Sequence, residues 1–226
     1  MIYVMSDIHG CYEKYDLMLQ KIDLQDEDKL YILGDFVDRG PNGLAVLEDA
    51  IKRDNVIALK GNHDDTAYNI LKRIVSNSPD LSRESFIEAM SLWLSDGGEE
   101  TFAEFKSLSG KKKIDAVRNL GSLVLYEELT INGQNYFLAH TVPEREIFLD
   151  EDNWGMDDFI WGEPEYEKVY KEDVIIVTGH TPTGFIDEKS AGYIWKHNNH
   201  IAIDCGAVFG NRLACICLDN GQEYYV

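Results

Sequence analysis

Short apolar runs alternate with amphipathic segments in the N-terminal quarter of the chain. The apolar runs at residues 1–5, 30–33 and 56–59 predict three buried strands. Between them, apolar residues recur at helical spacing over residues 12–22 and 44–51, which predicts two helices. Strands that alternate with helices indicate a parallel sheet whose crossover connections are right-handed.

The pattern changes between residues 65 and 120, where helical periodicity continues without a strand. We expect helices at residues 66–75, 82–94 and 99–108, the second of them with a polar start at Ser82. Three lysines at 111–113 are interpreted as a solvated helix start, with contact to a substrate as the alternative. The sequence therefore predicts a helical insert at about 65–120.

Strands predominate after residue 122. Two Asn-Gly pairs, Asn132-Gly133 and Asn220-Gly221, are typical of tight turns in β-hairpins. Strands are expected at residues 123–129, 136–139, 174–177, 193–195, 200–203, 213–218 and 223–226. We therefore expect one α/β domain over residues 1–226, with two packed sheets, helices outside them, and the helical insert.

The charge of the chain excludes several classes of partner. Among its 226 residues, 41 Asp and Glu oppose 21 Lys and Arg, so the net charge is −20 at pH 7. Such a field repels polyanions, which disfavours nucleic acid and anionic membranes as partners. There is no secretion signal and no apolar run long enough to span a bilayer. We therefore expect a cytoplasmic protein.

The four cysteines do not form a recognisable site. Cys11, Cys205, Cys215 and Cys217 are too sparse for a disulfide scaffold, and no Cys-x-x-Cys pair completes a tetrahedral zinc set. Cys215 and Cys217, two apart in a predicted strand, are interpreted as small buried residues in a reducing cytosol. Cys11 has no histidine to spare as a partner, so it is not expected to be a nucleophile.

Polar side chains follow five of the predicted strands. The carboxyl ends of parallel strands meet at one edge of a sheet, where ligands bind in open α/β folds. Imidazole and carboxylate groups together suit manganese, iron or zinc better than calcium, and six or more ligands exceed the usual three of one catalytic ion. The side chains expected to converge are Asp7, His9, Asp35, Asp38, Arg39, Asn62, His63, His140 and His180.

Each motif taken alone has a simpler structural explanation. Asp7 and His9 could belong to a turn, Asn62 or Asp64 could cap a helix, and the two later histidines could be hydrogen-bonded core residues. These explanations fail for the set, because Gly34-Asp-x-Val-Asp-Arg-Gly40 fixes six of seven positions and the other motifs accompany it in order. Two further histidines fall outside the pattern and are interpreted as structural, His197 and His200.

This ordered series resembles the calcineurin-like metallophosphoesterase superfamily, and its Val-Asp-Arg-Gly ending resembles the phosphoprotein phosphatase (Ser/Thr phosphatase) branch. Bacterial and phage members of that branch share a Trp-x-x-x-Gly-Gly-x-x-Thr stretch, found here at residues 93–101, and an Ile-Asp-Thr-Gly-Ala-Val segment similar to residues 203–208. The resemblance covers nearly the whole chain. It implies two mixed β-sheets packed face to face, with helices on both outer faces.

The resemblance also implies a role for each site residue. The metal ligands would be Asp7 and His9 for the first ion, Asp35 as the bridge, and Asn62, His140 and His180 for the second. His63 would be the general acid, Asp38 would orient it, and Arg39 would hold the phosphate. The resemblance implies direct attack on phosphorus by a hydroxide bridging two divalent ions, with manganese, iron and zinc as candidates.

The sequence departs from the family at the second phosphate-binding arginine, which usually lies between the two late histidines. Arg145 is the only arginine there, and Glu163 stands where phage members place theirs. Arg145, Arg212 and no second arginine remain alternatives. Asp64 also replaces a more usual glutamate, which is a small change. These departures leave the substrate more open than the chemistry.

Three functions compete. The main expectation is a phosphomonoesterase acting on phosphoserine or phosphothreonine in proteins, and the alternative is a hydrolase of dinucleoside polyphosphates such as diadenosine tetraphosphate. The acid-rich segment 141–172 suits a peptide better than a polyphosphate, unless it is only a solvated loop. A metal-folded binding module is the third, and the His63–Asp38 pair argues against it. The partner is thus a phosphorylated protein or a small phosphoester, and the sequence gives no signal for the oligomeric state.

Overall fold

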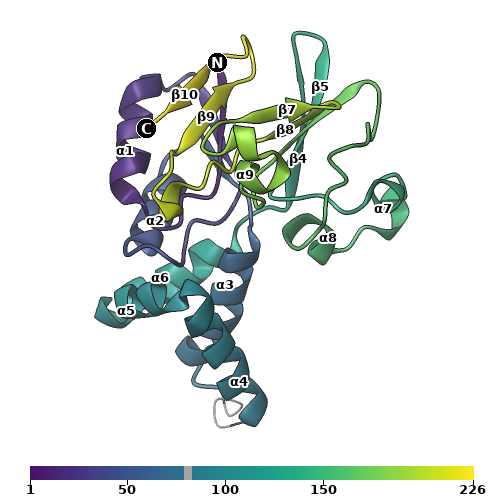
Figure 1. Cartoon of the computed structure of the whole chain (residues 1–226). Helices are drawn as coiled ribbons and strands as arrows, with labels where there is room; N and C mark the ends of the chain where they lie inside the picture. The colour runs from purple at the N-terminus through teal and green to yellow at the C-terminus, as the bar shows by residue number, and fades with distance from the viewer. Residues whose placement is uncertain (79–82) are drawn as a thin grey trace.

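The computed structural model describes residues 1–78 and 83–226, and these form two mixed sheets packed face to face (Figure 1). The first sheet has the order β10-β9-β1-β2-β3. Its strands are β1 (Ile2–Met5), β2 (Lys29–Ile32), β3 (Val56–Ala58), β9 (Ala214–Cys217) and β10 (Glu223–Tyr225). The first three are mutually parallel, as the alternating pattern predicts, and the last two add antiparallel at one edge.

The second sheet has the order β4-β5-β6-β8-β7. Its strands are β4 (Tyr126–Ile131), β5 (Gln134–Ala139), β6 (Val174–Thr178), β7 (Trp195–His197) and β8 (His200–Ala202). Strands β5, β6 and β8 are parallel, whereas β4 and β7 pair antiparallel at the two edges. The first hairpin turns at Asn132-Gly133 as predicted, although β4 begins three residues and β7 two residues later than expected. The predicted fold class is confirmed.

The main core lies between the two sheets. Val4 and Leu33 from the first sheet face Leu138 and Val177 from the second, and all four side chains are completely buried. Successive residues of a strand point to opposite faces, so Met5 instead faces the helices outside the first sheet. Burying each such side chain stabilises the fold by roughly 1.5–3 kcal/mol. The four cysteines are free, and all but Cys11 are buried.

Helices cover the outer faces of both sheets. Helices α1 (Tyr12–Ile22) and α2 (Gly43–Lys52) pack on the first sheet, where α1 buries the apolar residues whose spacing predicted it. The second sheet is covered by segment 141–172, which holds α7 (Arg145–Phe148), η3 (Glu151–Asn153) and α8 (Met156–Ile160) around an aromatic cluster. The connection from β6 to β7 carries α9 (Thr183–Ile186) and η4 (Glu188–Ser190), and η5 (Ala207–Phe209) precedes β9.

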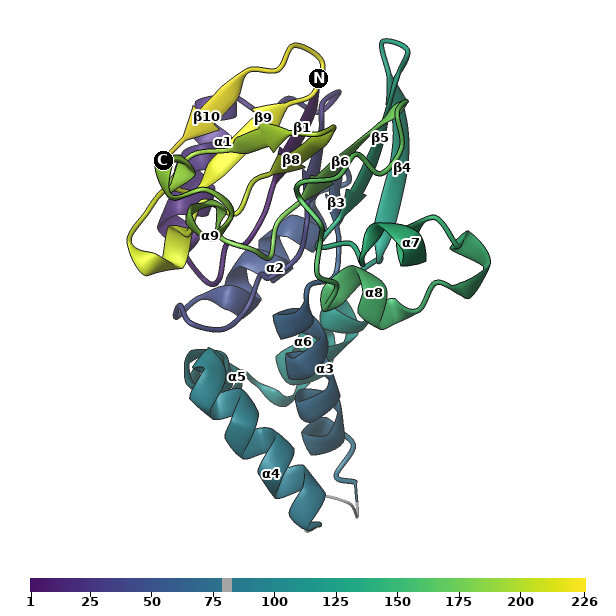
Figure 2. The ribbon, with the colours of Figure 1, turned by 45° about the vertical axis from the view of Figure 1, so that its right-hand side comes forward.

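The predicted insert forms a helical projection at one end of the sheets (Figure 2). Its elements are α3 (Asn62–Val75), α4 (Glu84–Trp93), the π-turn η2 (Leu94–Gly98), α5 (Glu99–Ser107) and α6 (Gly110–Gly121). Helix α3 begins four residues earlier than predicted, and Ser82, the predicted start of the second helix, lies outside the described residues. The three lysines at 111–113 lie at the start of α6. Within the described residues, no helix combines the length and apolar character needed to cross a bilayer.

Candidate active site

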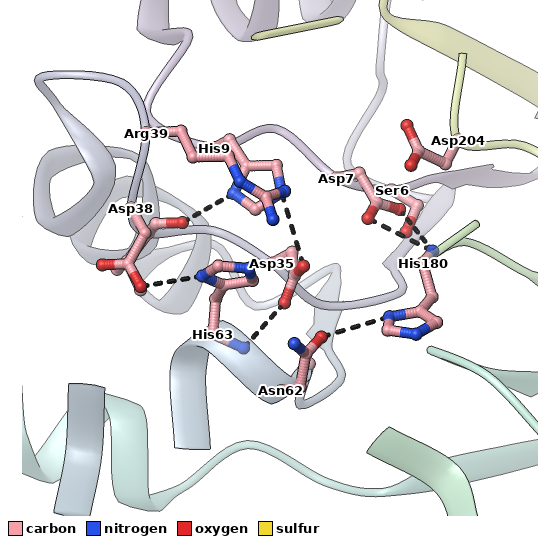
Figure 3. A network of polar contacts seen from close by, with 12 residues as sticks. Ser6, Asp7, His9, Asp35, Asp38, Arg39, Asn62, His63, His180 and Asp204 are labelled. Atoms are coloured by element: carbon pink, nitrogen blue, oxygen red, sulfur yellow. Dashed lines mark hydrogen bonds and ion pairs between the residues drawn. The ribbon is translucent and has the colours of Figure 1, made fainter. Parts of the chain in front are cut away.

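The predicted site residues come together at the carboxyl ends of β1, β2, β3, β5 and β6 (Figure 3). These strands run parallel within their sheets, and the two packed sheets present their carboxyl ends at the same edge. Hydrogen bonds or close ion pairs link every predicted residue to another one: Asp7, His9, Asp35, Asp38, Arg39, Asn62, His63, His140 and His180. The convergence expected from the sequence is therefore present.

His9 faces Asp35 through a fixed tautomer. Its Nδ1 lies 2.8 Å from the carbonyl oxygen of Val37, and because a carbonyl only accepts, Nδ1 carries the proton. The Nε2 lone pair then points inward, 3.4 Å from Asp35 Oδ2, where it accepts a hydrogen bond of 2.7 Å from Arg39 Nη1. Burial lowers the pKa of His9 to about 3, so the ring is neutral and available as a ligand.

A second group forms around His140 and Asn62. His140 Nδ1 donates to the carbonyl of Leu33 at 2.8 Å, which turns Nε2 toward Asn62 Oδ1 at 2.9 Å and His180 Nδ1 at 3.1 Å. In a neutral His140 ring, this Nε2 is a lone pair that faces the lone pairs of an amide oxygen. Such an arrangement is what a cation stabilises, because it supplies the positive charge that these donors share. The donor set therefore fits a metal ion.

Two buried carboxylates complete the site. Asp7 and Asp35 are each 2% exposed, and the amide of His180 donates to both oxygens of Asp7. Burial and the Asp35 charge raise the pKa of Asp7. Burial also acts to raise the pKa of Asp35, but the surrounding histidines lower it. Buried like charges are costly unless a cation neutralises them, so the pair also fits metal binding.

Asp35 belongs to both groups of side chains whose ligand atoms lie close enough together to hold a metal ion. One group is His9, Asp35 and His63, the other is Asp7, Asp35 and His140, and the ligand atoms of each lie within 4.8 Å of one another. A carboxylate shared by two groups is what a bridging ligand requires. Which of the two ions each remaining ligand would hold stays a prediction.

Asp38 holds His63 from one side. His63 Nδ1 lies 2.9 Å from Asp38 Oδ2, and Asp38 is completely buried. The same oxygen accepts from Trp93 Nε1 at 2.9 Å, and Thr101 Oγ1 donates to the other oxygen at 2.7 Å. Burial acts to lower the pKa of His63, but the Asp35 charge and the Asp38 hydrogen bond outweigh it and raise this pKa to about 9. Trp93 and Thr101 are the ends of the Trp-x-x-x-Gly-Gly-x-x-Thr stretch, which thereby gains a structural reason.

Arg39 lies between the site and the insert. Its backbone amide donates to the carbonyl of Gly97 at 2.8 Å, and Gly97 has φ 101°, which a side chain would resist. The guanidinium contacts His9, lies 3.9 Å from the exposed carboxylate of Asp96, and stacks on the Phe209 ring at 5.3 Å. The cationic head therefore lies at the open side of the site, where a phosphate can reach it.

Left-handed backbone concentrates at the site. The predicted residues with positive φ, between 45° and 69°, are Asp7, His9, Asp35, Asp38, Arg39 and His180. Each such residue costs roughly 1–3 kcal/mol and persists only where its surroundings hold it. The carboxylate of Asp64 is one such constraint, because it accepts the amides of Asp35, Phe36 and Gly61 at 2.8–3.0 Å.

Sequence reasoning assigned no role to Asp64 or to Asp204. Asp204 follows β8, is 5% exposed, and lies near Asp7 (Figure 3). Its Oδ1 accepts the amide of Gly206, and burial followed by the Asp7 charge raises its pKa well above the usual range. The signal was present, because Asp204 follows a parallel strand just as the other site residues do. For Asp64 the sequence offered only a helix cap as the simpler explanation, and its carboxylate does accept the backbone amide of Gly61 at the start of α3.

The two alternative phosphate-binding arginines are held elsewhere. Arg145 Nε donates to the carbonyl of Val169 at 2.8 Å, within the cover of the second sheet. The guanidinium of Arg212 stacks on the ring of Tyr193 at 4.1 Å. Of the arginines proposed from the sequence, Arg39 is therefore the one that the structure places against a predicted ligand.

Comparison with known proteins agrees with this arrangement. A model of the calcineurin-like phosphoesterase family matches residues 1–215. The bis(5'-nucleosyl)-tetraphosphatase PrpE (asymmetrical) of Anoxybacillus flavithermus is 26% identical over 247 residues, which cover 96% of this chain and 90% of the relative.

Two solved structures are also similar. A candidate diadenosine tetraphosphatase has a TM-score of 0.68 at 18% identity, with 100% of this chain and 92% of that one covered. A protein serine/threonine phosphatase from Saccharomyces cerevisiae has a TM-score of 0.59 at 15% identity, with 95% and 71% covered. At such identities the likeness extends to the fold alone.

Proposed function

Because this chain belongs to the calcineurin-like phosphoesterase family and is a metal-dependent phosphoester hydrolase, we propose that it hydrolyses dinucleoside polyphosphates such as diadenosine tetraphosphate. The observation that carries this proposal is the likeness to bis(5'-nucleosyl)-tetraphosphatase PrpE, which extends over 96% of the chain. That likeness supports the alternative expected from the sequence over the main expectation, a phosphorylated protein.

Two divalent ions would be held by the six ligands proposed from the sequence. The carboxylate and imidazole donors of this set suit manganese, iron or zinc. Bound ions of this kind supply positive charge to a phosphate and lower the pKa of water toward neutrality. The backbone carbonyls of Val37 and Leu33 fix the tautomers of His9 and His140, so each ring presents its Nε2 toward the proposed ions. The hydrogen bond that His9 Nε2 accepts from Arg39 would give way to the ion.

His63 is the proposed general acid. Asp38 holds its Nδ1, so the proton on Nε2 is the one directed at the leaving oxygen. A nucleotide phosphate is a far better leaving group than the alkoxide of serine or threonine, so an anhydride depends less on that proton. The contribution of His63 to the rate should therefore be smaller for a phosphate anhydride than for a serine or threonine phosphate ester.

Arg39 is the proposed phosphate clamp. Its side chain is 29% exposed, and the carboxylate of Asp96 is the nearest anion that a phosphate would displace. The guanidinium is positioned before the reaction by its contact with the Phe209 ring and by the backbone hydrogen bond from Arg39 to Gly97. Such a fixed cation stabilises negative charge that builds on the phosphoryl oxygens in the transition state.

A phosphorylated protein is the second candidate, and the acidic segment 141–172 is the observation that favours it. Several of these acids have internal partners, however. Asp158 accepts the amide of Gly155, Glu165 accepts the amide of Arg145, and Glu151 pairs with Lys171. Carboxylates that hold the segment together give a weaker reason to expect a basic peptide.

Kinetics on two substrates test the proposal. The measurement is kcat/KM for diadenosine tetraphosphate and for a phosphothreonine peptide, on one manganese-loaded preparation at one salt concentration. We expect the dinucleotide to be preferred by at least about tenfold, a difference of 1.4 kcal/mol in transition-state binding. A preference for the peptide would overturn the proposal and restore the protein phosphatase.

A further inference from the structure

A cavity of about 310 Å³ opens next to the candidate active site, and we call it the aromatic cavity. Its walls come from the start of α9, the residues after η4, and the loop that contains η5. The residues that matter below are Thr183, Phe185, Ala191, Phe209 and Asn211. The volume lies at the lower end of the range of about 300–1,000 Å³ for small-molecule sites.

Two exposed phenylalanines border the aromatic cavity. Phe185 is 85% exposed and Phe209 is 60% exposed, although most phenylalanines of the chain are buried. An exposed aromatic ring gains from covering its faces, and rings on two sides of a cavity suit a flat apolar ligand. Neither side chain belongs to a hydrophobic core cluster of the described residues, so core packing does not explain them.

The aromatic cavity adjoins the candidate active site. The guanidinium of Arg39 lies 5.3 Å from the centre of the Phe209 ring, and the same guanidinium donates to His9. On the other wall, the amide of Thr183 donates to the carbonyl of Asp204 at 2.8 Å, three residues after His180. If the phosphates of a ligand lie at Arg39, the group attached to those phosphates therefore lies at this cavity.

The lack of charged residues in the aromatic cavity favours an uncharged ligand group. None of the residues that line it is ionisable as an acid or a base at neutral pH, in a chain whose net charge is −20. A lysine-rich peptide finds no carboxylate there, and a polyphosphate finds no cation. Asn211 offers an amide with both a donor and an acceptor, which suits the polar edge of a heterocycle.

We propose that the aromatic cavity binds one nucleobase of the substrate, stacked on Phe185 and Phe209, while the attached phosphates pass along Arg39 to the metal site. This inference rests on the proposed function for the identity of the whole substrate. The base–aromatic contact is independent of which bond is cleaved. Stacking on aromatic side chains tolerates any base, because every base has a π-face.

Two variants alter the cavity without touching the proposed catalytic residues. Phe185→Leu removes one ring but keeps an apolar side chain, and Ala191→Trp fills the space where the base would lie. Trp161→Leu is the matched control, because Trp161 is also an exposed aromatic beside the site, 6.5 Å from the His180 ring and outside the cavity. The substrates are diadenosine tetraphosphate and bis(5'-ribosyl) tetraphosphate, the same molecule without its adenines.

The expected result is a change in KM rather than in kcat. Phe185→Leu and Ala191→Trp should each raise KM for diadenosine tetraphosphate about tenfold, and leave kcat and the kinetics of the ribosyl compound unchanged. Trp161→Leu should change neither. An unchanged KM in both cavity variants, or an effect confined to Trp161→Leu, would overturn the inference while leaving the proposed function intact.

A binding measurement separates this inference from the proposed function. Adenosine, which has no phosphate, should bind zinc-loaded protein in ligand-observed NMR, and Phe185→Leu should abolish the signal. If adenosine binds but diadenosine tetraphosphate is not hydrolysed, base binding in the aromatic cavity is supported and the proposed function is contradicted. If adenosine does not bind, base binding in the cavity is contradicted. A wild-type dimer that Phe185→Leu converts to a monomer would also contradict it, because the exposed rings would then be an interface.

Discussion

Trp93 Nε1 lies 2.9 Å from Asp38 Oδ2, so a side chain of the helical insert holds the carboxylate oxygen that orients His63. Thr101 binds the other oxygen from the opposite side of the π-turn. Gly98 allows this arrangement, because a Cβ there would lie 2.5 Å from the Trp93 ring. The geometry of the proposed acid therefore depends on residues about 30 and 40 positions away in the sequence.

Thr101→Val should lower kcat about tenfold with little change in KM. The hydroxyl both donates to Asp38 Oδ1 and accepts the amide of Asp38, so valine leaves a buried donor and acceptor unpaired, at a cost of about 1–3 kcal/mol each. Steady-state kinetics and thermal unfolding measure both effects. Thr130→Val, in the exposed part of the β4–β5 hairpin, is the control. Unchanged kcat in Thr101→Val would mean that Asp38 needs no such support.

His63→Asn should lower kcat by roughly 10²–10⁴ on a phosphate monoester with a poor leaving group, because asparagine supplies no acidic proton. The loss on diadenosine tetraphosphate should be smaller, since its leaving group is already a phosphate. Metal content, measured by atomic spectroscopy, should not fall. A loss of equal size across a series of aryl phosphates with different leaving-group pKa values would contradict the assignment as acid.

Asp35→Asn should lose bound metal and activity together. Asp35 belongs to both ligand groups, so an amide there removes one negative charge from each. The amide can still accept the backbone N–H of His63, which limits the structural damage. Metal per chain is measured by atomic spectroscopy after dialysis, with Asp49→Asn on α2 as the control. Wild-type metal content in Asp35→Asn would remove the bridging role.

His200 should make the protein less stable in mild acid. Its ring is 2% exposed, Nε2 lies 2.8 Å from Thr178 Oγ1, and burial lowers its pKa to about 3. The unfolded chain takes up a proton below about pH 6.5 while the folded ring stays neutral, so this stabilisation is complete above pH 6.5 and declines as the pH falls toward 3. At pH 5 the loss is about 2 kcal/mol.

Denaturant unfolding at pH 7 and pH 5 measures this difference. His200→Gln should reduce the fall in unfolding free energy between the two pH values. His197→Gln should keep the fall, because His197 pairs with His200 across β7 and β8 but is exposed. An equal fall in wild type and in His200→Gln would mean that another group titrates.

Local pattern and strand-end position predicted much of this fold, and both have a physical reason. Helix α1 has the predicted bounds because its apolar residues repeat at helical spacing and one face is buried. Helix α3 begins earlier than predicted because Asn62 and His63 were treated as part of a polar loop, whereas they occupy its first turn. The position of nine polar side chains at the carboxyl ends of strands predicted that they converge, and the individual roles of these side chains stay predictions.

What the sequence could not predict depends on contacts between distant segments. The left-handed backbone of Asp35 is held by the carboxylate of Asp64, and no local pattern encodes that hydrogen bond. The support of Asp38 by Trp93 and Thr101 joins the first sheet to the insert, so the motif was visible but its purpose was not. The place of Asp204 beside Asp7 is not visible in the sequence, where residues 203–208 show only a similarity to an Ile-Asp-Thr-Gly-Ala-Val segment.

The backbone hydrogen bond from Arg39 to Gly97 constrains how the enzyme can move. A Cβ on Gly97 would lie 2.7 Å from Arg39 Cγ, so the insert and the loop that carries Arg39 are in direct contact there. A movement of the insert would therefore also move Arg39 and Asp38, because Gly97, Trp93 and Thr101 bind them directly.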